Sequence, residues 1–142
     1  MVCVAAVLVC ALDMLFRSAA SFPPIVLIDT RPDDVSPAAE AFVRRNPDTI
    51  YVITSTSTFR AAQAGQRDAL QKLASILVHE EWHIRKGPDE RPAYEAQLTT
   101  LLSFGLSDGR PVFDEVRKSM LAVLAAQKRA ARRPEVVVAA AR

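Results

Sequence analysis

The sequence predicts an α+β fold in which a small antiparallel sheet packs on three main helices. Three short apolar runs lie between Ile25 and Thr54, and turn residues separate them. From Phe59 onward the apolar residues follow helical spacing, and glycine and proline divide this part into segments. A chain of 142 residues has room for one compact core, so we expect one folded domain at residues 21–132.

The N-terminal segment is almost wholly apolar from Met1 to Leu12, where Asp13 interrupts the run. A run of this length is too short to cross a bilayer as a helix but suits the core of a signal peptide. The small residues Ser18-Ala19-Ala20 then offer a cleavage site. We therefore expect residues 1–20 to be an export signal or membrane anchor, and the protein to be periplasmic, secreted or associated with a membrane through this segment. No Lys or Arg precedes the run, so a buried N-terminal helix in a cytoplasmic protein is the alternative.

Short β-branched runs predict the strands. Ile25–Ile28 has the pattern of a buried strand, and the prolines and aspartates of Arg31–Pro37 predict a loop after it. Ala41–Arg44 and Ile50–Thr54 flank the turn residues Asn46-Pro47-Asp48, which is typical of a hairpin. These runs together form the small sheet of the predicted fold.

Helical spacing dominates from Phe59 to Lys86. Four apolar residues of this stretch fall on one helical stripe: Leu70, Leu73, Leu77 and Ile84. Gly65 is expected to divide the stretch into a short helix and a longer one, and Gly87-Pro88 to end the longer one. Asp89 then occupies an N-cap position, and a second main helix is expected to run to about Phe104.

A third main helix is expected from about Pro111 to Ala131. Its predicted inner face consists of Val112, Val116, Met120, Leu121 and Leu124. The residues after it, 133–142, lack periodicity and are expected to form a flexible tail. Positive charge is concentrated from Arg117 onward, with seven basic residues and one acidic residue, Glu135. This part has no aromatic residue to stack on bases, so we predict no nucleic-acid partner and interpret the charge as a solvated helix face. Binding of this helix to an anionic surface is a further alternative.

The motif that carries chemistry is His79-Glu80-Glu81-Trp82-His83, which contains the two histidines of the protein. On a helix the two imidazoles project from one face, about 5–6 Å apart at their Cβ atoms, and can bind one zinc ion. Both cysteines lie in the first ten residues, so we expect His and carboxylate ligands. Glu80 does not ligate in this arrangement. It is expected to act as the general base that takes a proton from zinc-bound water.

A hydrolytic zinc site needs a third protein ligand, and the next helix offers Glu90 and Glu95. On a helical wheel Glu90 falls within the inward face and Glu95 near its edge. A carboxylate on an apolar face is costly unless it is paired or bound to a metal, which favours Glu90. Glu95 would lie level with Glu80 in a tight antiparallel pair of helices, so it stays the alternative ligand.

These residues resemble the gluzincin metallopeptidases, especially small single-domain bacterial members. The resemblance covers about Leu70 to Gly105 and depends on the HExxH motif followed by Glu90-x-x-Ala93-Tyr94. It implies a zincin-like fold, zinc as the cofactor, His79, His83 and Glu90 as ligands, and Glu80 as the catalytic residue. Six residues separate His83 from Glu90, fewer than in most large gluzincins. This shorter spacing bears on the assignment of Glu90 as the third ligand more than on the assignment of the two histidines.

The resemblance also implies a peptide or protein substrate, which pairs with an edge strand above the motif helix. Ile50–Thr54 is the candidate for that strand, although a plain core strand is an equal interpretation. Tyr94 could donate to an oxyanion, but an aromatic residue on this face is more often part of the core. The alternative function is a non-catalytic zincin-like protein with a structural metal or none.

Overall fold

The structure is a computed structural model that describes residues 2–133. Its elements are α1 (Val4–Met14), a short 3-10 helix (Ala19–Ser21), β1 (Ile25–Ile28), β2 (Ala41–Arg44), β3 (Thr49–Ile53), α2 (Ser57–Gln63), α3 (Arg67–Lys86), α4 (Glu90–Ser103) and α5 (Pro111–Ala131). The predicted α+β class is confirmed. Of the predicted tail at 133–142, residues 134–142 lie outside the described part of the chain. Within residues 2–133, no helix combines the length and the apolar character needed to cross a membrane.

The sheet has three strands in the order β1-β3-β2. β2 pairs antiparallel with β3, which confirms the predicted hairpin, whereas β1 pairs parallel with β3. The prediction of an antiparallel sheet is therefore wrong for β1. Residues 29–40 carry the chain past β3 before β2 begins, and apolar patterns do not encode the direction in which a strand enters a sheet.

β3 is the central strand, with Ile50, Val52 and Ile53 at most 1% exposed. The assignment of Ile50–Thr54 as an edge strand is therefore wrong, and the alternative interpretation, a plain core strand, is confirmed. The edges are formed by β1 and β2. β1 was expected to be buried, but Val26 is 39% exposed because an edge strand with one covered face leaves the other face open.

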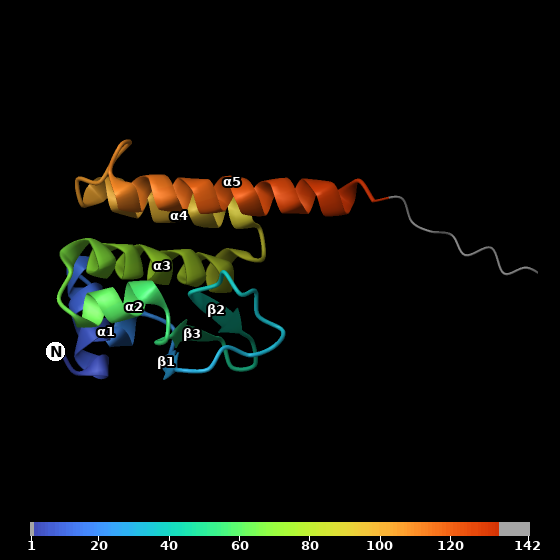
Figure 1. Cartoon of the computed structure of the whole chain (residues 1–142). Helices are drawn as coiled ribbons and strands as arrows, with labels where there is room; N and C mark the ends of the chain where they lie inside the picture. Colours follow the sequence, from blue (N-terminus) through green and yellow to red (C-terminus); the bar gives the residue numbers. More distant parts are fainter. Residues whose placement is uncertain (1, 134–142) are drawn as a thin grey trace, which may run out of the picture.

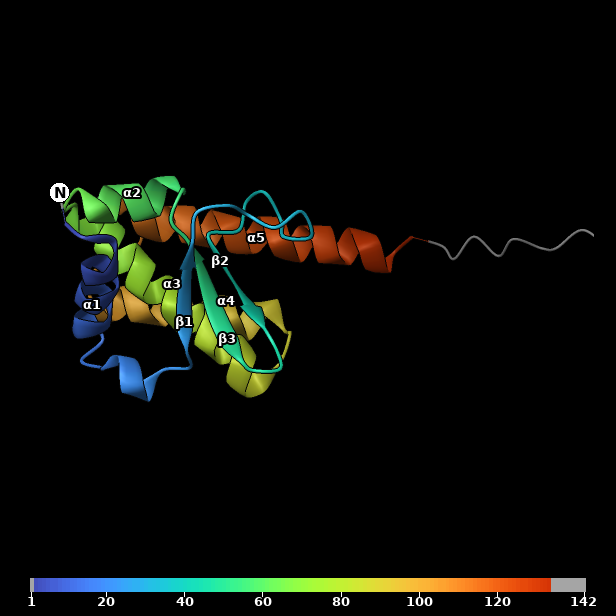
Figure 2. The same cartoon turned by 90° about the horizontal axis from the view of Figure 1, so that it is seen from below.

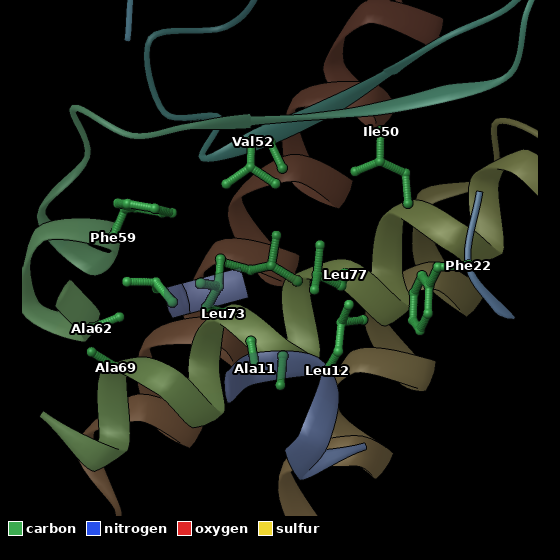
Figure 3. Close-up of a cluster of buried hydrophobic side chains, with 14 residues drawn as sticks. Ala11, Leu12, Phe22, Ile50, Val52, Phe59, Ala62, Ala69, Leu73 and Leu77 are labelled. Atoms are coloured by element: carbon green, nitrogen blue, oxygen red, sulfur yellow. The ribbon is translucent and has the colours of Figure 1, made fainter. Parts of the chain in front are cut away.

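Helix α3 lies in the middle of the molecule, with the sheet, α1 and α2 on one side and α4 and α5 on the other (Figure 1). Of the three long helices, α3 is the one that packs on the sheet, so the predicted packing of the sheet on all three is wrong. Leu73 and Leu77 of the predicted stripe enter the core from α3, where they meet Val52, Phe59 and residues of α1 (Figure 3). Enclosure from both sides also buries polar residues of α3.

The N-terminal segment contributes to this core. Val7, Ala11 and Leu12 of α1 are at most 2% exposed, and α1 packs across α3 (Figure 2). After the helix, the Arg17 guanidinium contacts both carboxylate oxygens of Glu81 at 2.6 Å. The N-terminal segment thus contains a buried helix, which is the structure that the alternative interpretation expects. Export of the protein stays a prediction.

The predicted helix ends agree with the structure. Gly65 has φ +88° and lies between α2 and α3, and Gly87 follows α3 with φ +116°, a conformation that glycine adopts without strain. The side chain of Asp89 accepts a hydrogen bond from the backbone N–H of Arg91, so it caps α4 as predicted. This short, defined turn determines where α4 begins relative to the end of α3.

Helix α5 packs on α4 through a second apolar cluster formed by Leu101, Leu106, Phe113 and Val116. Beyond Val116 its side chains are half-buried or exposed, and Leu121, predicted to face inward, is 58% exposed. The prediction for Leu121 is wrong because this residue lies five positions after the buried Val116, about 140° around the helix from it, and so faces away from α4. Farther along, the end of α5 extends beyond α4 (Figure 1).

Candidate metal centre

Three potential ligands converge where α3 turns into α4. His79 and His83 are one helical turn apart on α3, and Glu90 is the first residue of α4. The Nε2 atoms of the two histidines are 3.1 Å apart. Oε2 of Glu90 lies 3.2 Å from Nε2 of His79 and 3.4 Å from Nε2 of His83. The three atoms therefore form a nearly equilateral triangle.

This triangle has the size that a tetrahedral zinc site requires. With metal–ligand bonds of roughly 2.0–2.1 Å, two ligand atoms of a tetrahedron are separated by roughly 3.3 Å. The observed separations of 3.1, 3.2 and 3.4 Å differ from that value by a few tenths of an ångström at most. Among the residues that the structure describes, this is the one group of three His, Cys, Asp or Glu residues with such convergence. The donor set thus fits zinc, with a fourth position left for water.

The charges of the three side chains favour a cation between them. Hydrogen bonds from His79 and His83 lower the pKa of Glu90 to about 2, so this side chain is a carboxylate at neutral pH. Burial lowers the pKa of His83, but hydrogen bonds to Glu90 and Gly87 outweigh it and raise the pKa above its usual value. Both shifts indicate that positive charge is stabilised at this point.

His83 has a hydrogen-bond partner that orients its ring. Its Nδ1 lies 2.9 Å from the carbonyl oxygen of Gly87. With the ring hydrogen on Nδ1, His83 donates to this carbonyl and keeps the Nε2 lone pair free for a metal. The guanidinium of Arg45 donates to the carbonyl oxygens of His83 and Ile84, at 2.8 and 3.0 Å, and so joins the β2–β3 turn to the end of α3.

His79 is held differently. Its Nδ1 is buried, and no hydrogen-bond partner is present among the described residues. The ring instead meets the ring of Tyr94 edge-on, with the centroids 4.5 Å apart. Packing between α3 and α4 therefore orients His79, whereas a hydrogen bond orients His83.

Glu80 lies beside the triangle and is 8% exposed. Burial raises the pKa of its carboxyl group, the electrostatic effect of the imidazoles of His79 and His83 opposes this rise, and the charge of Glu90 adds to it. The net result is a raised pKa, which makes the carboxylate of Glu80 a stronger base than that of an exposed glutamate. Burial and nearby carboxylates also raise the pKa of Tyr94 to about 12, so its phenol stays protonated.

Glu95, the alternative third ligand, is exposed on α4 and is not part of the triangle. It lies five residues after Glu90, which places it on a different side of the helix. Trp82 of the motif is half-buried and contacts His83 edge-on. The structure thus brings together His79, Glu80, His83 and Glu90 and leaves Glu95 apart.

Two hollows meet at this centre, and Glu80, Glu90 and Ala41 line both of them. The inner hollow, about 320 Å³ in volume, lies between residues 36–41 and helices α3, α4 and α5. The outer hollow, about 580 Å³, lies between residues 34–36, β2 and the Gly87-Pro88 turn. An extended molecule bound across the centre can therefore occupy both hollows.

The strand beside the centre is β2, not β3. The N–H of Ile53 donates to the carbonyl of Glu40 at 3.0 Å, so these two opposite residues are a hydrogen-bonded pair. Hydrogen-bonded and non-hydrogen-bonded pairs alternate along an antiparallel ladder, so Ala41 and Val43 belong to non-hydrogen-bonded pairs. Their backbone N–H and C=O groups therefore point away from β3, toward the free edge of the sheet. Both residues line the outer hollow.

Comparison with protein-family models, curated proteins and solved structures finds no match for this chain. The likeness to gluzincins therefore stays a resemblance that depends on the motif residues and Glu90.

Two ion-pair clusters near the centre are not evident from the sequence. One joins Arg17 to Glu81, within the motif, and the other joins Lys72 to Glu40 and Glu115. Lys72 is 7% exposed although it lies in a helix with many charged residues. The sequence does contain one indication of this position. Lys72 lies seven residues before His79, which is nearly two helical turns, so both residues are expected on the same face of α3.

Proposed function

We propose that this protein is a zinc-dependent hydrolase of zincin-like fold whose substrates are peptides or proteins. The observation that carries the proposal is the triangle formed by His79, His83 and Glu90, whose dimensions fit tetrahedral zinc, next to a buried glutamate at the meeting point of two hollows. Two histidines, one carboxylate and an open fourth position are the ligand set of hydrolytic zinc sites, whereas structural sites are closed by four protein ligands.

In this proposal each residue of the centre has one task. His79, His83 and Glu90 hold the zinc ion, which when bound acidifies a water molecule and polarises a carbonyl group. Glu80 accepts the proton of the attacking water and passes it to the leaving amine. Its burial supports this role because a raised carboxyl pKa makes the carboxylate a stronger base toward the proton of water.

The free edge of β2 is the proposed binding site for an extended substrate. Ala41 and Val43 offer backbone N–H and C=O groups there, and an added strand can pair with them. Main-chain pairing selects an extended backbone without regard to sequence, which supports peptides as the substrate class. The phenol of Tyr94 lines the inner hollow, keeps its proton, and can donate a hydrogen bond to a developing oxyanion.

The test uses the full chain loaded with zinc, together with the variants Glu80→Gln and His79→Ala. Wild-type protein and Glu80→Gln are expected to hold one zinc ion per chain, while peptide hydrolysis falls roughly 100-fold or more in Glu80→Gln. His79→Ala is expected to lose zinc. Metal analysis by mass spectrometry and hydrolysis of a quenched fluorescent peptide library measure both properties.

Full hydrolysis by Glu80→Gln would remove this residue from the mechanism, and undiminished zinc in His79→Ala would refute the ligand assignment. Zinc binding without hydrolysis of any peptide in the library would favour the alternative, a non-catalytic zincin-like protein. A spectroscopic count of four protein ligands would favour it too, because such a site is closed to water.

A further inference from the structure

Part of the lining of the inner hollow is apolar. Ile76 of α3 and Val116 and Val123 of α5 line it, and Tyr94 lines it on the α4 side. Its volume of about 320 Å³ is at the lower end of the range for ligand pockets, about 300–1,000 Å³, so it suits one long side chain rather than a folded segment.

Lys72 and Glu40 also line this hollow and belong to a cluster of three charges. The ammonium of Lys72 lies 3.1 Å from Oε2 of Glu40 and 2.7 Å from Oε1 of Glu115 on α5. The other oxygen of Glu40 accepts a hydrogen bond from the hydroxyl of Thr58. The cluster thus fixes the carboxylate of Glu40 at the hollow from two directions.

The cluster carries one positive and two negative charges, so one carboxylate is left without a compensating cation. The side chain of Lys72 is 9% exposed, whereas those of Glu40 and Glu115 are 25% and 59% exposed. Lys72 and Glu40 line the hollow and Glu115 does not, so the carboxylate that an entering group meets there is that of Glu40, which is more exposed than its partner Lys72.

The outer hollow differs in its balance of charges. Its two arginines are each paired with one aspartate, Arg44 with Asp34 at 2.8 Å and Arg45 with Asp48 at 3.4 Å. Glu80 and Glu90, which line both hollows, would be balanced by the proposed zinc ion. The cluster beside the inner hollow thus has one carboxylate more than it has cations, and Glu40 is its carboxylate in the lining of the hollow.

Building on the proposed function, we infer that the inner hollow binds a lysine or arginine side chain of a peptide substrate and that Glu40 is the residue that selects it. The apolar part of the lining contacts the methylene groups of such a side chain, and the carboxylate of Glu40 accepts hydrogen bonds from its cationic end. A glutamate side chain of similar length would meet Glu40 with like charge.

The first experiment measures kcat/KM of the zinc-loaded protein for matched peptides that carry lysine, norleucine or glutamate at one position near the cleaved bond. Lysine is expected to be preferred over norleucine by about tenfold at one such position, and over glutamate by more. Glu40→Gln is expected to reduce the preference for lysine to about twofold or less, while kcat/KM for the norleucine peptide changes by less than about threefold. A merely structural role of Glu40 would lower both values together and would overturn the inference.

Two further variants test the position of the charge. Glu115→Gln removes the other carboxylate of the cluster and is expected to reduce the preference for lysine less than Glu40→Gln does, because Glu115 is the more exposed of the two. Asp34→Asn, in the outer hollow, is the matched control and should leave the preference unchanged. An equal loss of preference in all three variants would overturn the inference, since it would indicate a general effect of net charge.

The second experiment needs no turnover. N-acetyl-lysine amide, N-acetyl-norleucine amide and N-acetyl-glutamate amide are titrated into the full chain, and methyl resonances of Ile76, Val116 and Val123 report binding. The lysine compound is expected to bind wild-type protein at least about fivefold more tightly than the other two, and Glu40→Gln to abolish this difference. Equal binding of the three compounds to wild-type protein overturns the inference even if peptides are hydrolysed. Selective binding of the lysine compound without hydrolysis of any peptide supports the hollow and refutes the proposed hydrolase.

Discussion

At the scale of single residues, the two imidazoles of the candidate centre differ in what holds them. His83 is oriented by the carbonyl of Gly87, while Nδ1 of His79 has no partner among the described residues and the ring depends on contact with Tyr94. Glu90 completes the triangle from the first turn of α4. The turn at Gly87-Pro88 therefore controls both the ring of His83 and the position of Glu90.

The first residue-scale prediction compares the two glutamates that the sequence offers as third ligand. Glu90→Gln is expected to weaken zinc binding by roughly 10- to 100-fold or more, because an amide oxygen is a poorer zinc ligand than a carboxylate. Glu95→Gln, on the exposed side of α4, is expected to leave zinc affinity unchanged. Competition with a chromophoric zinc chelator measures both constants. A loss confined to Glu95→Gln would reverse the assignment.

A second prediction concerns the pH dependence that Lys72 confers on stability. Burial lowers the pKa of Lys72, but the charges of Glu40 and Glu115 and their hydrogen bonds outweigh this and raise it above its usual value of 10.5. Because the pKa is higher in the folded state, the stabilisation is fully present below about pH 10.5 and is lost as the pH rises through the folded-state pKa.

Glu115→Gln weakens this cluster, so its free energy of unfolding should lie below that of wild-type protein by a constant amount between neutral pH and about pH 10.5, and the difference should shrink above that pH. Urea unfolding at a series of pH values measures the difference. A difference that grows above pH 10.5 would contradict the raised pKa.

At the scale of elements, α3 connects the apolar core to the candidate centre. Its stripe of apolar residues packs on β3, and its last two turns carry the motif between α4 and the β2–β3 hairpin. The end of this helix leaves carbonyl groups that its own N–H groups cannot satisfy. Arg45 of the hairpin donates to two of them, those of His83 and Ile84, so the hairpin and the centre are joined directly.

Two neighbouring arginines provide an element-scale prediction. Arg45→Met removes the two hydrogen bonds to the end of α3 and is expected to cost about 1–2 kcal/mol of unfolding free energy. Arg44→Met removes an ion pair with the exposed Asp34 and is expected to cost less than Arg45→Met, because solvent screens this pair. Urea unfolding of both variants gives the comparison. Equal losses would mean that Arg45 contributes no more than a surface charge does.

The elements also show which parts of the fold the sequence predicts. Helices α3, α4 and α5 and the turns between them are evident because their signals are local: apolar spacing, a capping Asp89, and glycines at the ends. The spacing of His79 and His83 predicts their proximity for the same reason. The direction of β1, the central place of β3 and the pairing of Lys72 with Glu40 depend on segments distant in the sequence, and no local pattern records them.

At the scale of the whole molecule, the core and the candidate centre lie along the same helix and share its supports. α1 covers one side of α3, and Arg17 after it contacts Glu81 within the motif. The guanidinium of Arg17 also stacks 3.8 Å above the ring of Phe22, which belongs to the core. The N-terminal segment is thus a structural part of the domain at residues 2–133, in addition to any role in export.

The last prediction separates these two roles of the N-terminal segment. Leu12 is 2% exposed and Phe16 is 98% exposed, although both are large apolar residues of the same segment. Leu12→Ala is expected to lower the free energy of unfolding by about 2–5 kcal/mol, because it removes buried methyl groups and leaves a cavity. Phe16→Ala is expected to change it by at most about 0.5 kcal/mol.

Urea unfolding of the full chain, followed by circular dichroism, measures both variants. A total stability of about 5–15 kcal/mol is usual for a domain, so the loss at Leu12 is a large fraction of it. A leader that does not belong to the folded domain would make the two substitutions equivalent. An unchanged urea midpoint for Leu12→Ala would therefore exclude α1 from the core and leave export as the role of residues 1–20.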